Sequence, residues 1–315
     1  MSTEGGTTAI LAALAANVGI AVTKFIAFLL TQSSSMLAES IHSLADSGNQ
    51  LLLLLGGKRA RRQATPEHPF GFGRERYVYA FIVSIVLFSL GGCFALYEGW
   101  HKFHDPHGID SWQWVPIVVL LASIGLESFS FRTAIHESRP HKAGRSWVGF
   151  VRNAKAPELP IVLLEDFGAL IGLVFAMIGV VMTLITGNGR WDAAGSAMIG
   201  LLLVTIATIL AIEMKSLLIG ESATAEDVAA IEAALPGDGV GRIIHLKTMH
   251  LGPEELLVAA KIAVEAGDSA SDVARAIDSA ERRVRAAVPI ARVIYLEPDI
   301  YDRSRAASAE PGTGR

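Results

Sequence analysis

One polar segment within an apolar stretch reads Glu39-Ser40-Ile41-His42-Ser43-Leu44-Ala45-Asp46. The surrounding stretch is long enough to cross a bilayer. An ionisable side chain there costs about 2.5–3.5 kcal/mol on insertion scales, so it usually serves a function and has a partner. His42 and Asp46 are four residues apart and share one helix face. A neutral imidazole beside a carboxylate suits one half of a site for a divalent transition metal.

A second apolar stretch is interrupted by Leu163-Leu164-Glu165-Asp166, and Asp166 is the candidate for the other half of the site. Taken alone, His42 with Asp46 is equally well explained by a buried hydrogen bond that only packs helices. Asp166 favours the metal site, because two unrelated structural ionisable sites in lipid would be a costly coincidence.

Composition indicates a membrane protein with a soluble tail. The chain has 315 residues, 51% of them hydrophobic and 18% charged. Its mean hydropathy of +0.42 is too high for an ordinary soluble protein. The apolar residues crowd into 1–220. A single cysteine, Cys93, excludes a disulfide framework and a thiolate zinc site. A net charge of −4 without a basic tract argues against a nucleic-acid partner.

The apolar stretches predict six membrane spans of about 20 residues each. They cover residues 8–30, 36–56, 77–100, 113–134, 160–186 and 193–219. Because residues 1–8 lack a positively charged segment, we interpret the first stretch as a retained helix and not as a signal peptide.

Basic residues predict the orientation of these spans. They gather in two loops, as Lys58, Arg59, Arg61, Arg62, Arg74 and Arg76 after the second span and Arg139, Lys142, Arg145, Arg152 and Lys155 after the fourth. The alternate loops carry almost none. The positive-inside rule therefore places both termini in the cytoplasm.

Further polar residues inside the spans have two interpretations each. Glu39 either orients the His42 imidazole, as carboxylates beside metal ligands do, or bridges to a neighbouring helix. Asn17 either packs helices or binds metal, and Glu127 either pairs with Arg132 or joins the site. Asn49 lies one turn beyond Asp46 and is a further candidate beside the metal.

Gly168 and Gly172, just after Asp166, form a small-xxx-small pair that would let another helix approach closely.

The tail, residues 221–303, has the pattern of a small α+β domain. We expect a helix over 225–235, strands over 242–250 and 256–264, a helix capped by Ser269 with Asp272, and a strand over 292–297 ended by Pro298. This order is typical of a two-layer sandwich of helices on a sheet. Residues 304–315 are small and polar, and we expect them to be disordered.

Three segments resemble those of the cation diffusion facilitator family. They are Ser34-Ser35-Met36-Leu37-Ala38-Glu39-Ser40-Ile41-His42-Ser43-Leu44-Ala45-Asp46, His68-Pro69-Phe70-Gly71-Phe72-Gly73-Arg74-Glu75-Arg76 and Tyr97-Glu98-Gly99. The resemblance implies a six-helix membrane bundle with cytoplasmic termini, a cytoplasmic ferredoxin-like domain and a homodimer.

The family's transport site takes two ligands from the second span and two from the fifth. By position, the resemblance makes His42, Asp46 and Asp166 ligands, and the fourth would fall at Val162, which cannot bind metal. Leu163-Leu164-Glu165-Asp166 instead resembles a divergent subgroup that includes zinc transporter 9-like proteins. Either Glu165 turns into the site, or water, Asn17 or a backbone carbonyl fills the fourth position. Pairing of Glu165 with a neighbouring helix is equally compatible.

Other metal sites of the family look degraded here. Only His68, with Glu67 beside it, is left between the second and third spans, and in the tail only His245 survives. We expect weak or absent metal binding in the tail. His101, His104 and His107 cluster after the third span and either collect metal or are scattered interfacial histidines.

The resemblance implies export of a divalent cation by metal–proton exchange with alternating access, and no enzymatic activity or resident cofactor. His42 is the best-placed proton carrier, because an unperturbed histidine titrates between pH 5 and 8. Zinc is the first choice of metal, and Fe²⁺, Co²⁺ and Mn²⁺ stay open. A membrane-embedded sensor and a passive channel are the rival functions; a metalloprotease lacks its His-Glu-x-x-His helix. We expect the bacterial inner membrane as the location.

Overall fold

The computed structural model describes residues 3–109, 111–142 and 144–301, with side chains from Asn17 onward. The chain forms two compact units. The helical unit comprises the described residues up to Arg61 together with Glu75–Lys215. The C-terminal unit comprises Arg62–Arg74 and the described residues from Ser216 onward, so the loop after the second expected span groups with the tail.

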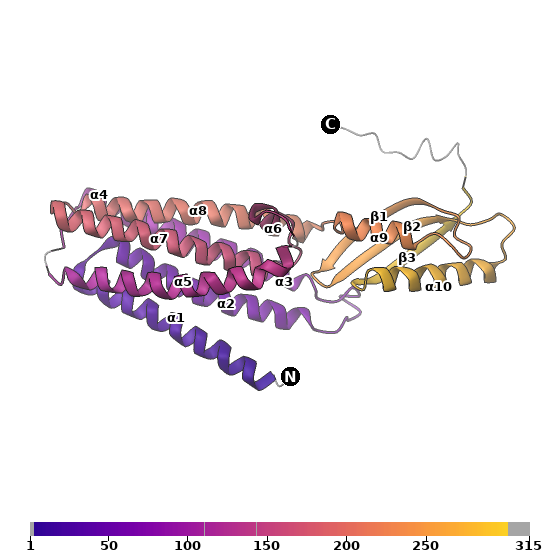
Figure 1. The fold of residues 1–315 in the computed structure, drawn as a ribbon, viewed down its shortest axis with the longest axis horizontal. Helices are drawn as coiled ribbons and strands as arrows, with labels where there is room; N and C mark the ends of the chain where they lie inside the picture. Colours follow the sequence, from indigo (N-terminus) through magenta and orange to yellow (C-terminus); the bar gives the residue numbers. More distant parts are fainter. Residues whose placement is uncertain (1–2, 110, 143, 302–315) are drawn as a thin grey trace, which may run out of the picture. The chain divides into compact units, whose positions relative to one another are not determined.

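Each of the six expected spans falls on a helical segment of the chain (Figure 1). The segments are α1 (Thr3–Thr31), α2 (Ser34–Ala60), α3 (Glu75–Val86) with the π-helical η1 (Leu87–Cys93) and α4 (Phe94–His104), α5 (Trp114–Lys142), α7 (Glu158–Thr186) and α8 (Arg190–Ile219). A short helix, α6 (Trp147–Asn153), lies between α5 and α7 in the chain.

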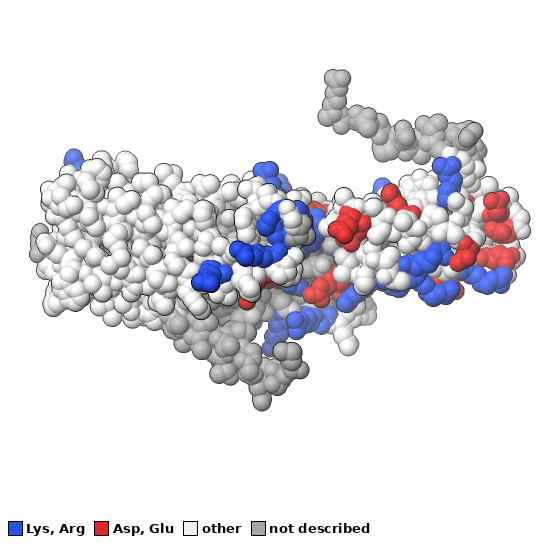
Figure 2. All heavy atoms as spheres, in the orientation of Figure 1, with Lys and Arg blue, Asp and Glu red and all other residues white. Residues whose placement is uncertain are grey.

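Four segments among the described residues are long and apolar enough to cross a membrane: Glu75–His104, Trp114–Lys142, Glu158–Thr186 and Arg190–Ile219. Large apolar side chains such as Phe129, Ile185 and Leu201 are exposed on them. The face of the helical unit seen in Figure 2 carries few charged side chains, and Lys and Arg gather at one of its ends. An apolar surface of this extent needs lipid around it, and the chain is an integral membrane protein.

The second helix, α2, is too polar to meet the same criterion of length and hydropathy. Its polar side chains are buried inside the protein, including Glu39, His42 and Asn49. They are therefore shielded from lipid, as intramembrane polar residues generally are.

Asp192 of α8 holds the beginning of α2 in place. Its carboxylate accepts hydrogen bonds from the Ser34 backbone N–H at 2.7 Å and from the Ser33 hydroxyl at 2.8 Å. Unpaired N–H groups at a helix N-terminus favour such an anion. The contact fixes the starting point of the helix that carries His42 and Asp46.

Gly168 and Gly172 permit two close helix contacts, which confirms the prediction for this pair. A Cβ on Gly168 would lie 2.6 Å from Cδ1 of Ile206 in α8, and one on Gly172 would lie 2.8 Å from Oε1 of Glu39 in α2. The fifth expected span, α7, thus packs tightly against α2 on one side and α8 on another.

The third expected span contains the π-helical segment η1, which no sequence signal indicated. Within it, a Cβ on Gly91 would lie 3.9 Å from Nδ1 of His42, so this segment passes close to the imidazole. A π segment of this kind often occurs near a functional site.

The C-terminal unit contains α9 (Ala225–Ala234), β1 (Arg242–Gly252), β2 (Glu255–Ala263), α10 (Ala270–Ala287) and β3 (Ala291–Asp299). The expected order of helix, strand, strand, helix and strand is confirmed.

The strands form one sheet in the order β1-β2-β3, with β1 antiparallel and β3 parallel to β2. Its core includes Ile231, Val258, Ile262 and Val284.

Two details of the tail test the sequence signals. The capping box is confirmed: Ser269 accepts from the Asp272 N–H, and the Asp272 carboxylate accepts from the Ser269 N–H. The predicted end of the last strand at Pro298 is wrong, because Pro298 pairs with Ile262 and β3 continues to Asp299. Since β3 is an edge strand, the missing N–H of proline is tolerated there. Residues 304–315 lie outside the described part of the chain.

Candidate metal centre

A small polar cavity of about 50 Å³ lies among α1, α2, α5 and α7. It is lined by Asn17, Ile20, Ser43, Asp46, Gln50, Leu126, Glu127, Ser130 and Asp166. Asp46 and Asp166 come from two different helices, as the sequence pattern required. The cavity places two predicted ligands at one point in the membrane-embedded part of the chain.

His42 lies one turn before Asp46, with 3.5 Å between its Nδ1 and Asp46 Oδ1. The imidazole is 1% exposed and the Asp46 side chain 17% exposed. Within the described part of the chain, neither ring nitrogen of His42 has a hydrogen-bond partner, and neither has Asp46 Oδ1. Buried polar atoms are rarely left unsatisfied, so these three are candidates for an external ligand.

Asp166 is held by a serine from a neighbouring helix. The Ser130 hydroxyl of α5 donates to Asp166 Oδ2 at 2.8 Å. Such a donor fixes the orientation of a carboxylate and leaves its other oxygen available. No sequence pattern singles out Ser130, since a serine in a span is common and its partner is remote in the chain.

Within residues 3–109, 111–142 and 144–301, no three His, Cys, Asp or Glu side chains lie close enough together to hold a metal ion. The structure thus brings His42 to Asp46, and Asp46 to the same cavity as Asp166, without gathering all three. Because metal–ligand distances are about 2.0–2.2 Å, a shared ion requires movement of side chains or helices.

Glu165 and Asn49 form a bridge between α7 and α2. The Asn49 Nδ2 donates to Glu165 Oε1 at 2.7 Å, and both side chains are buried. Of the two interpretations of Glu165, this contact corresponds to pairing with a neighbouring helix. It also gives Asn49 a partner other than His42 and Asp46.

Glu39 pairs with Lys24 of α1 and does not orient His42. The Lys24 Nζ lies 2.9 Å from Glu39 Oε2 and 2.8 Å from the Ser43 hydroxyl. Lys24 is 1% and Glu39 0% exposed. A buried charge needs such a partner, because the uncompensated ion would be strongly unfavourable in a membrane. Lys24 was not singled out from the sequence, although a lone lysine in an apolar stretch was the available signal.

Asn17 and Glu127 both face the polar cavity. The Asn17 Nδ2 donates to Gln50 Oε1 at 3.2 Å. Glu127 lines the cavity together with Asp46 and Asp166, which corresponds to the second of its two interpretations. Three carboxyl groups around so small a space repel one another unless a cation or protons join them.

The other histidines are dispersed over the described residues. His68 lies against the Phe72 ring, with 4.6 Å between ring centroids. His245 is an exposed residue of β1. His104 lies against Trp100, with ring centroids 4.2 Å apart, and His107 Nδ1 lies 3.6 Å from Asp105 Oδ1. His101 stacks on Tyr97.

Comparison with known proteins places these residues in a family context. The family model described as the cation efflux transmembrane domain matches residues 10–219. The human proton-coupled zinc antiporter SLC30A9, mitochondrial, is 33% identical over 232 residues, which cover 73% of this chain and 41% of the relative. Metal tolerance protein C4 of Arabidopsis thaliana is 28% identical over 246 residues, covering 76% and 53%.

The magnetosome protein MamM of Paramagnetospirillum magneticum is 28% identical over 134 residues, covering 40% of this chain and 41% of the relative. The matched regions span 41% to 43% of the length of the human and Xenopus laevis antiporters. His42, Asp46 and Asp166 all lie within the residues that the family model matches.

Proposed function

The chain belongs to the cation diffusion facilitator family, and on this premise we propose that it exports a divalent transition metal from the cytoplasm in exchange for protons. The resemblance to the zinc transporter 9-like subgroup is confirmed by the SLC30A9 relatives. The proposal is carried by one observation: Asp46 and Asp166, from α2 and α7, line one cavity beside His42.

In this proposal His42, Asp46 and Asp166 bind the transported ion. Two carboxylates and one neutral imidazole leave the bound dication with roughly no net charge, which lowers its cost in a medium of low dielectric constant. Glu127 lines the same cavity as both aspartates and supplies the fourth donor in place of Val162. It does so through its carbonyl oxygen while it carries a proton, so the charge balance is kept. Glu39, Glu165 and Asn49 position the helices through their own partners.

Zinc is the proposed substrate, since relatives that are 33% identical carry the name zinc antiporter. Fe²⁺, Co²⁺ and Mn²⁺ are the alternatives. The imidazole suits Fe²⁺ and Co²⁺ as well as zinc, and the carboxylates suit the harder Mn²⁺.

Proton coupling follows from competition for the same side chains. A ligand must be deprotonated to bind metal, so protons that arrive from the far side promote metal release. His42 is the proposed carrier. Opening of the helices to one side and then to the other completes the exchange.

The proposed architecture has six spans, with both termini in the cytoplasm as the basic loops indicate. Residues 1–220 form the transport domain, and residues 221–303 form a cytoplasmic ferredoxin-like domain through which two copies associate. We propose a bacterial inner membrane as the location; the SLC30A9 relatives are mitochondrial by name.

A test uses the full chain in proteoliposomes that contain a pH-sensitive dye, with an imposed Zn²⁺ gradient. We expect Zn²⁺-dependent proton movement that is lost in His42→Ala, Asp46→Asn and Asp166→Asn. Glu137→Gln is the control, because Glu137 is an exposed carboxylate on α5, the helix that carries Glu127.

Zn²⁺ movement without proton movement would indicate a channel, and the absence of any flux with a folded protein would indicate a sensor. Full transport in Asp46→Asn or Asp166→Asn would contradict the site assignment.

A further inference from the structure

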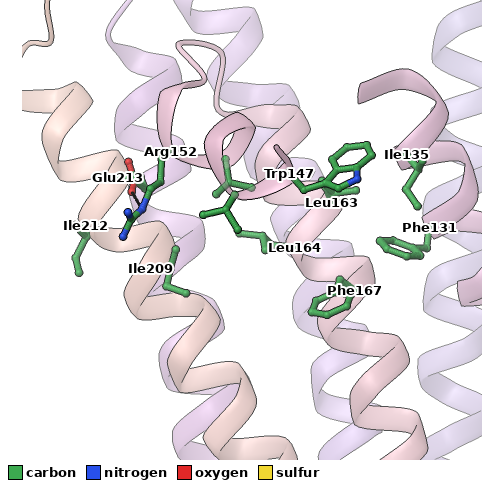
Figure 3. A pocket seen from close by; sticks show the side chains of 12 residues that line it. Phe131, Ile135, Trp147, Arg152, Leu163, Leu164, Phe167, Ile209, Ile212 and Glu213 are labelled. Atoms are coloured by element: carbon green, nitrogen blue, oxygen red, sulfur yellow. Dashed lines mark ion pairs between the residues drawn. The ribbon is translucent and has the colours of Figure 1, made fainter. Parts of the chain in front are cut away.

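A second hollow in the helical unit is an apolar groove of about 490 Å³, separate from the polar cavity. Figure 3 shows its side chains, which come from α5, α6, α7 and α8. Its apolar wall includes Phe131, Ile135, Leu164, Phe167, Ile209 and Ile212. We refer to it as the leaflet groove.

The leaflet groove lies near one end of the helices, in the depth range of one lipid leaflet. Phe167 is nine residues from the start of α7 at Glu158, and Ile209 is ten residues from the end of α8 at Ile219. At the rise of an α-helix, each lies about 15 Å from its helix end. This distance is half of the roughly 30 Å hydrocarbon core of a bilayer.

The groove itself is lined by one charged pair, Arg152 and Glu213, and the segment that borders it is basic. Residues 139–157 contain Arg139, Lys142, Arg145, Arg152 and Lys155 and no Asp or Glu. Within this segment α6 supplies Trp147 and Arg152 to the groove. The Arg152 side chain is 71% exposed, and its Nε lies 4.0 Å from Glu213 Oε1, too far for a hydrogen bond.

Trp147 also marks the level of the membrane surface. The Lys142 Nζ lies 5.5 Å from the centre of the Trp147 ring. Tryptophan and lysine side chains gather at the boundary between headgroups and hydrocarbon. The apolar wall therefore extends inward from a mouth at headgroup depth.

We propose that the leaflet groove binds an acyl chain of an anionic phospholipid whose headgroup lies at Arg152. A basic pocket between membrane helices on the cytoplasmic side is suited to an anionic headgroup, and the apolar wall is suited to the chain below it. The groove and its mouth thus match the two parts of one lipid molecule.

Bound lipid would touch the helix that carries Asp166. Leu164 and Phe167 of α7 face the groove, whereas Asp166 lines the polar cavity. The helices α5 and α7 each line both hollows, on different faces. The lipid therefore adjusts the position of α7, and this part of the inference rests on the proposed transport function.

Binding is tested with the full chain in nanodiscs of phosphatidylcholine that contain increasing amounts of phosphatidylglycerol brominated on its acyl chains. Bromine quenches nearby tryptophan, and Trp147 emission is obtained as the difference between the native chain and Trp147→Phe. We expect half-maximal quenching of Trp147 at about fivefold less brominated phosphatidylglycerol than brominated phosphatidylcholine, the factor expected of one interfacial basic side chain.

Arg152→Gln should remove this preference, and Arg139→Gln should retain it. Arg139 is the matched control, because it is an exposed arginine of the same basic segment that does not line the groove. Equal quenching by the two lipids, or equal loss in both arginine variants, would overturn the proposal. Quenching of Trp147 by neither lipid would show that a second copy or another segment covers the groove, and would overturn it as well.

A second measurement uses the native chain alone, so its result does not depend on whether the variants fold. Native mass spectrometry after delipidation should retain phosphatidylglycerol in preference to phosphatidylcholine. Lipid binding is measured without Zn²⁺, so its failure is distinct from failure of transport. If binding holds but Zn²⁺ flux is the same with and without phosphatidylglycerol, the effect on α7 is refuted while the site remains.

Discussion

Lys24 in α1 and Glu39 in α2 form an ion pair with 2.9 Å between Nζ and Oε2, and both side chains are fully enclosed by protein. The pair lies one turn from His42 and joins the first two helices of the bundle. Breaking a buried pair leaves one charge without compensation, whereas replacing both partners by apolar residues does not.

We therefore predict that Lys24→Met lowers the free energy of unfolding by about 3–5 kcal/mol, because Glu39 then stays buried and unpaired. The double variant Lys24→Met/Glu39→Met should recover most of this loss. Unfolding of the purified chain in detergent measures both. Lys58→Met, at the exposed end of α2, is the control and should change little. A double variant as unstable as the single one would contradict the argument.

Ser130→Ala should weaken Zn²⁺ binding by about tenfold or more, as removal of a group that orients a metal ligand does. The reason is the 2.8 Å hydrogen bond from Ser130 to Asp166. Calorimetric titration of the purified chain with Zn²⁺ measures the affinity. Thr133→Val is the matched control, since Thr133 is exposed on the same helix and its hydroxyl donates to the Phe129 carbonyl within that helix. Equal affinities of Ser130→Ala and the native chain would remove Ser130 from the site.

Gly179→Ala should destabilise the chain by about 1–3 kcal/mol through overpacking. A Cβ there would lie 2.9 Å from the Trp191 carbonyl oxygen and 3.3 Å from the Asp192 Cα, and backbone atoms cannot rotate away. Gly125→Ala, where nothing lies within 4 Å of the new Cβ, should be neutral or stabilising because alanine favours a helix. Thermal unfolding of the two variants distinguishes them, and the reverse order would speak against the packing of α7 on α8.

The capping box of α10 should make this helix sensitive to acid. The hydrogen bond from the Ser269 hydroxyl, and then that from its backbone N–H, holds the pKa of Asp272 below its ordinary value of 3.8. A group with a lowered folded-state pKa stabilises the fold above its unfolded-state pKa and loses that contribution as the pH falls through the folded-state pKa.

Ser269→Ala should therefore reduce hydrogen-exchange protection of the α10 amides by about fivefold at neutral pH, the effect of losing one N-cap. The difference from the native chain should shrink as the pH falls below the ordinary aspartate value of 3.8 and through the lower folded-state pKa of Asp272. Exchange of the full chain, followed by mass spectrometry, measures it. Asp278→Asn, at an exposed residue in the middle of α10, is the control. A difference that is constant down to the lowest pH would argue against the role of Asp272.

The sequence predicted the parts of this protein that depend on local spacing. The i, i+4 relation of His42 and Asp46 survives in the 3.5 Å separation of their side chains, because a helix determines which residues share a face. The cap at Ser269 is equally local. The length of the apolar stretches also located the segments that form α5, α7 and α8.

Contacts between side chains of different helices could not be predicted in this way, because they depend on how each helix is rotated about its own axis. Glu165 turns toward Asn49, and Glu39 turns toward Lys24. Glu127 faces the cavity because α5 packs with that side against α7. None of these orientations is encoded by spacing within a single span.

The π-helical segment Leu87–Cys93 also has a consequence for the helix beyond it. Each residue in a helix corresponds to about 100° of rotation about the helix axis. The wider π-helical turn therefore changes which side of the following helix, α4, faces its neighbours. The contact face of α4, where a Cβ on Gly99 would lie 2.9 Å from the Ala193 carbonyl oxygen, is therefore set by this wide turn. Deleting a single residue from the segment would swing that face away from α8, so the length of the third span is constrained by angle and not only by bilayer thickness.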